Sequence, residues 1–300
     1  MRAYLQLMRL PNVFTAMADI ALGFLFTHER LAPLPQFALL LAASSLLYLG
    51  GMVLNDFFDQ EQDARERPFR PIPSGRVSPA TAKRLGFGML SLGTALGWTA
   101  SAVSGDVRSG VVATLLAAAV LTYDGWLKKT LAGPLVMGAC RTLNVLLGMS
   151  LADGDWHAVH WVVALGIGLY IVGVTVFARS EARESGKAQL ILGTIILAAG
   201  IALVASLPQW VSGNEWPPID TPPRWYVFWG LIGLLIAGRC ARAALSASPP
   251  LVQAAVRSCI FSLVVLDAGT CAAVHDMATA AAILLLLAPT LLLGRWIYST

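Results

Sequence analysis

The sequence has little charge: Asp, Glu, Lys and Arg make up 13% of its 300 residues, whereas 57% are hydrophobic. A soluble globular domain carries about 25% charged residues, so this chain lacks the polar side chains to cover a surface in water. Its mean hydropathy of +0.69 indicates a lipid bilayer as the solvent. The net charge of +4 is small and spread along the chain, and it excludes an argument for nucleic-acid binding.

The cysteines lack any recognisable pattern. Four of them are scattered through apolar stretches without Cys-x-x-Cys spacing, namely Cys140, Cys240, Cys259 and Cys271. This distribution gives no metal-binding or disulfide framework. We therefore interpret these side chains as packing residues.

Long apolar runs fill most of the chain. A helix needs about 20 apolar residues to cross a bilayer, and runs of that kind fall near residues 11–27, 35–54, 79–104, 108–124, 133–152, 157–178, 188–207, 225–245, 252–274 and 277–297. They predict an all-α, polytopic transmembrane helical bundle of nine or ten spans, nine if one of the last two does not cross. Nothing indicates a separate soluble domain, so we expect residues 1–300 to form a single transmembrane domain.

The distribution of Lys and Arg predicts the orientation. With the N-terminus in the cytoplasm and alternating spans, only Arg30, Arg108 and Arg224 of the 21 basic residues fall outside. Cytoplasmic loops of membrane proteins carry the excess of positive charge. We therefore expect an integral membrane protein, in a bacterial cytoplasmic (inner) membrane, with the loop after the second span facing the cytoplasm.

That loop contains the densest group of charges, between Asn55 and Arg76. On a helix, Asp56, Asp59 and Asp63 would lie on one face, within about 60° of one another. Such stacked carboxylates repel unless a cation lies among them, and their oxygens suit Mg²⁺. Arginines directly downstream are suited to gripping phosphate, and the candidates are Arg67 and Arg70. The alternative is a solvated loop with internal salt bridges.

The pattern Asn55-Asp56-x-x-Asp59-x-x-x-Asp63, followed by Arg70-Pro-Ile-Pro-Ser-Gly, resembles the first signature of the UbiA-type membrane prenyltransferases. The resemblance implies that these four residues form a Mg²⁺ site, with the aspartates also catalytic. It further implies an isoprenyl diphosphate as donor, a lipophilic or aromatic acceptor, and contact with membrane lipid.

Other positions extend the resemblance along the chain. Arg9-Leu-Pro-Asn12 is similar to the start of the family, which implies that Asn12 lines the cavity; an N-cap is the alternative. Tyr123 and Lys128 match a Tyr-x-x-x-Leu-Lys segment, which implies contact with the diphosphate; Lys128 could equally be a membrane anchor. Arg141 and, three positions on, Asn144 lie inside an apolar run, where an arginine requires a polar cavity or an acidic partner.

The sequence departs from the family at its second acidic motif. The loop after the sixth span carries Glu181 and Glu184 where aspartates are expected, and Ala188 at the third position. Two hypotheses stay open: the glutamates hold a second Mg²⁺, or they pair with neighbouring basic residues. The altered motif looks more like the EboC-like branch than the ubiquinone or menaquinone enzymes, so we do not carry over the acceptor of those enzymes.

These observations predict a prenyltransferase in which Mg²⁺ assists the departure of diphosphate and the acceptor is unidentified. One alternative is a non-catalytic or transport-type membrane protein that kept the fold. A second alternative is a CDP-alcohol phosphotransferase, but the Asp-Gly-x-x-Ala-Arg pattern of that family is absent: Asp124-Gly125 is followed by Trp126-Leu127-Lys128.

Overall fold

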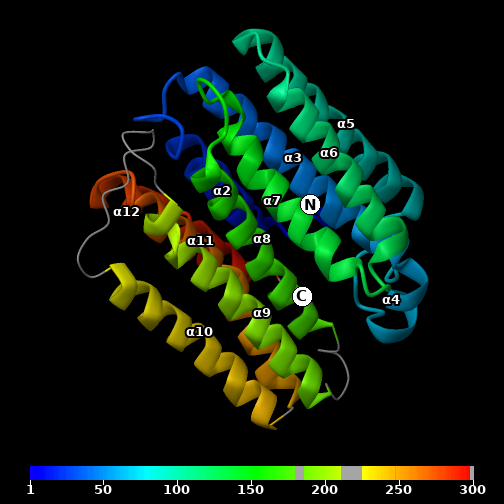
Figure 1. The fold of residues 1–300 in the computed structure, drawn as a ribbon. Helices are drawn as coiled ribbons and strands as arrows, with labels where there is room; N and C mark the ends of the chain where they lie inside the picture. Colours follow the sequence, from blue (N-terminus) through cyan, green and yellow to red (C-terminus); the bar gives the residue numbers. More distant parts are fainter. Residues whose placement is uncertain (180–185, 211–224, 247, 298–300) are drawn as a thin grey trace.

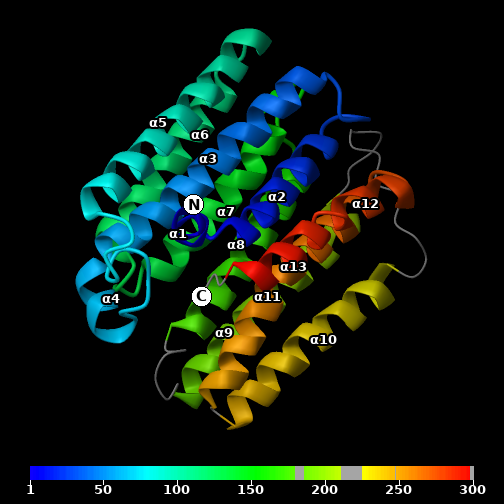
Figure 2. The same cartoon turned by 180° about the vertical axis from the view of Figure 1, so that it is seen from behind.

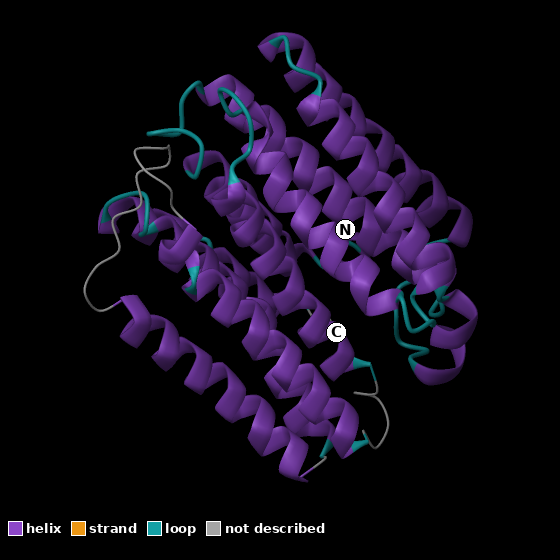
Figure 3. Ribbon diagram, in the orientation of Figure 1, coloured by secondary structure: helices purple, strands orange, loops and turns teal. Residues whose placement is uncertain are grey.

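The protein is an all-helical bundle. The computed structural model describes residues 1–179, 186–210, 225–246 and 248–297. Within those ranges helices are joined by loops and no strand occurs (Figure 3). The all-α prediction is therefore confirmed.

The helices follow the apolar runs closely. The first part of the chain forms α1 (Arg2–Leu7), a 3-10 turn (Leu10–Asn12), α2 (Val13–Leu25), α3 (Leu34–Phe58), α4 (Gln60–Glu66), α5 (Pro79–Ser104), α6 (Arg108–Thr122), a π-helical turn (Tyr123–Leu127) and α7 (Gly133–Gly148), extended by a 3-10 turn (Met149–Leu151). The second part forms α8 (Ala158–Ala178), α9 (Lys187–Ala205), a 3-10 turn (Leu207–Trp210), α10 (Trp225–Ser246), α11 (Pro249–Cys271), α12 (Met277–Leu284) and α13 (Leu287–Trp296).

All ten predicted segments are helical. In the described ranges, eight stretches are long and apolar enough to cross a bilayer, the last comprising α12 and α13 together. Each of the other two predicted segments meets only one of these two criteria, length and hydropathy. Helix α5 has 26 residues but is less apolar, whereas α2 is apolar but has only 13 residues. The last two predicted segments are separate helices, because α11 ends at Cys271 and α12 begins at Met277.

Two antiparallel helix pairs, α3 with α5 and α8 with α9, are the most closely packed pairs of the bundle. Glycines allow this approach: a Cβ on Gly93 would lie 2.9 Å from the carbonyl oxygen of Ala43, and one on Gly173 would lie 2.2 Å from the amide nitrogen of Leu197. Small residues let membrane helices pack backbone against backbone. The acidic loop predicted from residues 55–76 joins the first pair, and residues 179–186 join the second.

Helix α2 lies in the middle of the bundle, where it packs against α3, α7 and α11. Helices α5 and α6 form one edge and α10 the opposite edge, as both views show (Figures 1 and 2). Helix α4 marks one end of the bundle, where α3 ends and α5 begins; we call this the motif end. Arg179, just after α8, donates to the Thr130 carbonyl oxygen in the α6–α7 connection, so the α8–α9 connection starts at the motif end as well.

Candidate functional site

The three aspartates lie where helix α3 gives way to α4. Asp59 is the junction residue, with φ −89° and ψ 4°, so the three aspartates do not lie on one uninterrupted helix. Backbone hydrogen bonds nevertheless run from the Asp59 amide to the Asn55 carbonyl and from the Asp63 amide to the Asp59 carbonyl. The chain therefore keeps a helical path and aims the acidic side chains at one end of the bundle.

Asp56 and Asp63 are buried and share one arginine. The Arg70 guanidinium Nη1 donates to Asp63 Oδ2 at 2.6 Å and to Asp56 Oδ1 at 3.3 Å. Arg70 itself is only 6% exposed, so both carboxylates and their cation are withdrawn from water together. Breaking a buried ion pair leaves an uncompensated charge, which is strongly destabilising. The Arg-Pro-Ile-Pro-Ser-Gly segment thus folds back to neutralise the acidic motif that precedes it.

Arg9 supplies a second cation to Asp56. Its Nη2 lies 3.1 Å from Asp56 Oδ1. Burial, the largest single effect, would lower the pKa of Arg9, but Asp56, Tyr48 and Asp63 together outweigh it and raise the pKa, so the guanidinium is charged. Arg9 has φ 46° and ψ 46°, and in the described ranges it is the single non-glycine residue with positive φ. This left-handed conformation costs on the order of 1 kcal/mol, and the turn between α1 and α2 directs the guanidinium to the motif.

Asp59 and Asn55 contact the π-helical turn that follows α6. Lys128 Nζ forms an ion pair with Asp59 Oδ2, and Asn55 Nδ2 donates to Asp124 Oδ1 at 2.7 Å. A π turn adds a residue to the helix and changes the direction of its side chains, and such turns are frequent at functional sites. The Tyr123–Leu127 turn thereby places Asp124 beside Asn55 and Lys128 beside Asp59. Tyr123 is buried at the start of the same turn.

These contacts bear on the predicted metal site. The carboxylate and amide oxygens of Asn55, Asp56, Asp59 and Asp63 are the hard donors that Mg²⁺ prefers. In the described ranges, however, no three acidic, histidine or cysteine side chains are grouped so as to hold a metal ion. Basic side chains contact the carboxylates instead. The side-chain oxygens of the motif are of the kind that Mg²⁺ binds. For the aspartates to bind a metal ion, their basic partners would have to move to another anion.

Arg141 and Asn144 belong to a second polar cluster, inside the bundle. Arg141 Nη1 donates to Asp19 Oδ2 at 2.5 Å and Asn144 Nδ2 donates to the same oxygen at 2.8 Å. The prediction that Arg141 needs a cavity or an acidic partner is confirmed, and the partner is Asp19. Their predicted contact with substrate stays a prediction. Arg141 also lies over the ring of Tyr48, at 5.9 Å from its centroid.

The remaining predicted residues lie as follows. Asn12 occupies the N-cap position of α2, as the N-cap alternative predicts, but its side chain makes no capping hydrogen bond. Arg67 lies at the C-terminal end of α4, next to the Asp63–Arg70 pair. Glu181 and Glu184 lie outside the described residues, so the choice between a second metal site and local salt bridges stays open.

Sequence reasoning missed two residues of the site, Arg9 and Asp124. Each carried a signal that could have found it. Arg9 precedes a helix that begins at a proline, and it is expected at the same membrane face as the acidic loop. Residues 55–76 contain more acidic than basic side chains, so a cation from elsewhere is needed. Asp124 directly follows Tyr123 at the end of an apolar run, where a carboxylate needs a hydrogen-bond donor.

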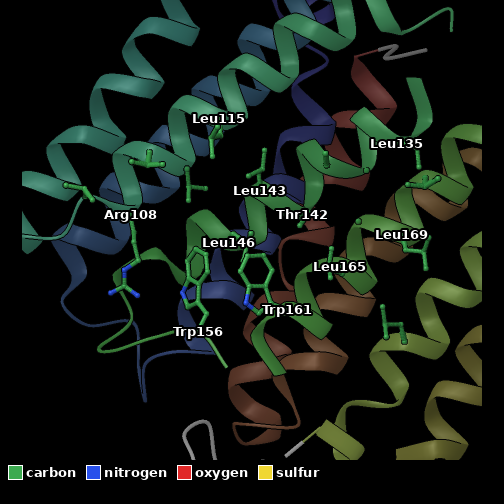
Figure 4. Close-up of a pocket in the computed structure, with 18 residues that line it drawn as sticks. Arg108, Leu115, Leu135, Thr142, Leu143, Leu146, Trp156, Trp161, Leu165 and Leu169 are labelled. Atoms are coloured by element: carbon green, nitrogen blue, oxygen red, sulfur yellow. The ribbon is translucent and has the colours of Figure 1, made fainter. Parts of the chain in front are cut away.

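An apolar groove of about 800 Å³ runs along α7 between α6 and α8. Trp156 and Trp161, whose ring centroids are 5.5 Å apart, lie at one end with Arg108, and Leu135 and Leu169 lie at the other (Figure 4). Arg108 is held there by Asp106 and by the Gly154 carbonyl oxygen at 2.7 Å. The Leu135 end is nearer to the motif end, because α7 begins directly after the connection that contains Lys128.

Comparison with known proteins gives relatives for the chain. Residues 16–189 match the UbiA prenyltransferase family. The chain is 32% identical over 158 residues to the digeranylgeranylglyceryl phosphate synthase of Saccharolobus solfataricus, covering 52% of this chain and 54% of that protein. It is 36% identical over 158 residues to the enzyme of the same name from Ignicoccus hospitalis, covering 52% and 49%. The chain thus spans about half the length of the curated relatives it matches.

Solved structures match nearly the whole fold. A UbiA homologue from Archaeoglobus fulgidus, bound to GPP and Mg²⁺, superimposes with a TM-score of 0.68 at 14% identity, over 95% of this chain and 99% of that one. The apo structure of a UbiA homologue from Aeropyrum pernix K1 gives a TM-score of 0.62 at 18% identity, over 86% and 96%. At these identities the likeness is one of fold. The names of these relatives do not test the EboC-like assignment, which stays a prediction.

Proposed function

The chain belongs to the UbiA prenyltransferase family, and from this premise we propose that it moves an isoprenyl group from an isoprenyl diphosphate to a lipid acceptor, with chemistry at the motif end. One observation carries the proposal: every aspartate of the motif is paired with a basic side chain that can also bind phosphate. Arg70 contacts Asp56 and Asp63, Arg9 contacts Asp56, and Lys128 contacts Asp59.

The balance of charge suggests how the donor is bound. The three carboxylates face three cations from separate parts of the chain. A diphosphate arriving with Mg²⁺ offers each partner a new counter-ion, because guanidinium and ammonium groups bind phosphate oxygens and carboxylates bind the metal. Arg9 and Lys128 are the partners best placed to move, since their side chains are 22% and 26% exposed, whereas that of Arg70 is 7% exposed.

The departure of diphosphate is the step that this arrangement assists. Bound Mg²⁺ supplies Lewis-acid stabilisation of the negative charge that develops on the leaving group. Arg9, Arg70 and Lys128 add positive groups beside the motif, which stabilise the charge on the leaving phosphate oxygens once they have moved from the carboxylates to the diphosphate. Asp59 and Asn55 orient the Lys128 ammonium and the Asp124 carboxylate. The carbon–oxygen bond to the diphosphate breaks, the allylic carbon bonds to the acceptor, and the proton that the acceptor loses passes to the released diphosphate or to water.

The apolar groove along α7 offers a place for the isoprenyl chain. It is lined almost entirely by aliphatic and aromatic side chains from α6, α7 and α8. A hydrocarbon chain that starts near the α6–α7 connection can follow it without leaving the bilayer. Apolar walls also keep water from the reactive carbon.

For the acceptor, we propose a lipid with a glycerol phosphate head. The support is the activity of the relatives to which about half of the chain is similar, the digeranylgeranylglyceryl phosphate synthases. An aromatic acceptor is the alternative. We further propose that residues 1–300 act as one domain in a cytoplasmic membrane, with the motif end towards the cytoplasm, where the excess of Lys and Arg would lie.

A direct assay tests the proposed function. Membranes containing the protein are incubated with Mg²⁺, radiolabelled isoprenyl diphosphates of several chain lengths, and either prenylated glycerol phosphates or aromatic acceptors. We expect label to enter lipid with the glycerol phosphate acceptor, and no transfer with the Asp56→Ala/Asp59→Ala variant. Absence of transfer with every donor and acceptor would favour the non-catalytic or transport-type alternative. Transfer to the aromatic acceptor alone would overturn the proposed acceptor and keep the reaction.

A further inference from the structure

A pair of acidic residues lies deep in the bundle, away from the motif end. Asp19 is on the central helix α2 and Asp267 is on α11, and both are 0% exposed. Helices α2 and α11 pack directly against each other. Acidic side chains inside a membrane bundle are costly unless they are paired, so each polar atom here needs a partner.

The two carboxyl groups differ in the hydrogen bonds that they accept. Asp19 Oδ2 accepts from Arg141 at 2.5 Å and from Asn144 at 2.8 Å. Asp19 Oδ1 and both oxygens of Asp267 have no hydrogen-bond donor. The Asp267 and Asp19 carboxyl groups lie close enough together to interact with each other. The oxygens without donors are therefore gathered in one place between α2 and α11.

Two ionised carboxylates cannot form this contact, because an ionised carboxylate only accepts hydrogen bonds. The charges do not balance either: Arg141 is the cation that contacts the cluster, and it faces two acids. The other polar neighbour is already used, since the Asn144 amide oxygen accepts from Ser44 at 2.6 Å. A magnesium or calcium ion would need six or more oxygen ligands, more than the unpartnered oxygens provide. One proton satisfies both the geometry and the charge.

We propose that Asp19 and Asp267 form a proton-binding site in which a neutral Asp267 donates its O–H to Asp19 Oδ1, while ionised Asp19 pairs with Arg141. The site gives every carboxyl oxygen of Asp19 a donor and leaves a single negative charge opposite a single positive charge. It also links three helices, because Arg141 is on α7. Thr15 on α2 holds the second nitrogen of the same guanidinium at 2.7 Å.

Infrared difference spectroscopy of the full-length protein in lipid vesicles tests the proton directly. A protonated carboxyl group has a C=O band well separated from ionised carboxylates, and this band shifts in D₂O. We expect such a band in the wild-type protein and its loss in Asp267→Asn. The control is Asp155→Asn, which should keep the band because Asp155 is exposed. A wild-type spectrum without the band, or a band unchanged in Asp267→Asn, would overturn the proposal.

Thermal unfolding in sodium-free buffer gives a second measurement that does not depend on the band. Asparagine at position 267 can still donate to Asp19, so Asp267→Asn should unfold near the wild-type midpoint, while Asp267→Leu should unfold several degrees lower. Equal midpoints for the two variants would contradict the hydrogen bond. A wild-type midpoint that rises with sodium, in a manner lost in Asp267→Asn, would show that a metal ion takes the place of the proton and would also overturn the proposal.

Discussion

The protein has two acidic clusters, which differ in the number of basic partners and in their exposure to solvent. At the motif end, three aspartates face Arg9, Arg70 and Lys128, of which the first and last are partly exposed. Inside the bundle, Asp19 and Asp267 are both fully buried, and among the described residues Arg141 is the basic side chain that pairs with Asp19. The first cluster can exchange its cations for a bound ligand without exposing a charge to hydrocarbon. The second cannot, because any group that leaves it stays in the apolar interior. Hence the first suits a site of reaction, and the second suits a fixed link between helices.

The largest effect is expected from removing the exchangeable acids. Asp56→Ala/Asp59→Ala should lower prenyl transfer by about 10³-fold or more, because the variant loses two donors for Mg²⁺ and the partner of Lys128. The fold should persist, since the motif lies at an end of the bundle. Transfer assays beside thermal unfolding of the same preparation check both parts. Activity within tenfold of wild type would show that this cluster is not the reaction site.

The second largest effect is expected from removing Arg70. This cation of the motif cluster is buried as fully as the two aspartates that it contacts. Arg70→Ala leaves Asp56 with Arg9 and removes the buried ion pair of Asp63, and breaking a buried pair in this way costs about 3 kcal/mol of unfolding free energy. The variant should therefore lose both stability and affinity for the diphosphate. Denaturant unfolding and the KM for the donor measure the two losses. A variant with reduced affinity and wild-type stability would place Arg70 among the exchangeable cations.

Lys128 should show the converse behaviour, with a smaller loss of activity and little loss of stability. Lys128→Ala removes one partly exposed positive group at the leaving diphosphate, which corresponds to about tenfold in kcat/KM, or roughly 1.4 kcal/mol. Lys129→Ala is the matched control, because Lys129 is exposed. The kcat/KM of this variant should stay within about twofold of wild type. Equal losses in both variants would support a membrane-anchoring role for Lys128.

The smallest effect should come from the apolar groove, which contains neither cluster. Ala139 is an exposed residue of the lining, and Ala139→Trp would fill part of the groove. Transfer from long isoprenyl diphosphates should fall by about fivefold, while transfer from the shortest donors should be little changed, since a lost pocket contact of about 1 kcal/mol corresponds to about that factor. The ratio of kcat/KM for long and short donors is the measurement. An unchanged ratio would remove the groove from the path of the chain.

Sequence alone predicted the site well where chemistry is concentrated in a short segment. The spacing of Asn55, Asp56, Asp59 and Asp63 and the arginines after them identified the acidic site, and the structure brings Arg70 back onto it. It failed where partners come from distant parts of the chain. Arg9 is 47 residues from Asp56, and Asn55 is 69 residues from Asp124, so no local pattern joins them. The break at Asp59 was also missed, because a helical register continues through it.

The sequence by itself determined that the chain is helical and spans a membrane, and that one loop carries a dense group of acids and arginines. These properties follow from composition and periodicity, which tertiary contacts cannot change. Tertiary structure alone decided which cation neutralises which acid, that a π turn presents Asp124 and Lys128 to the motif, and that Asp267 faces Asp19 across 248 residues of sequence. Pairing inside a bilayer depends on which helix faces touch, and that is set by packing of the whole bundle.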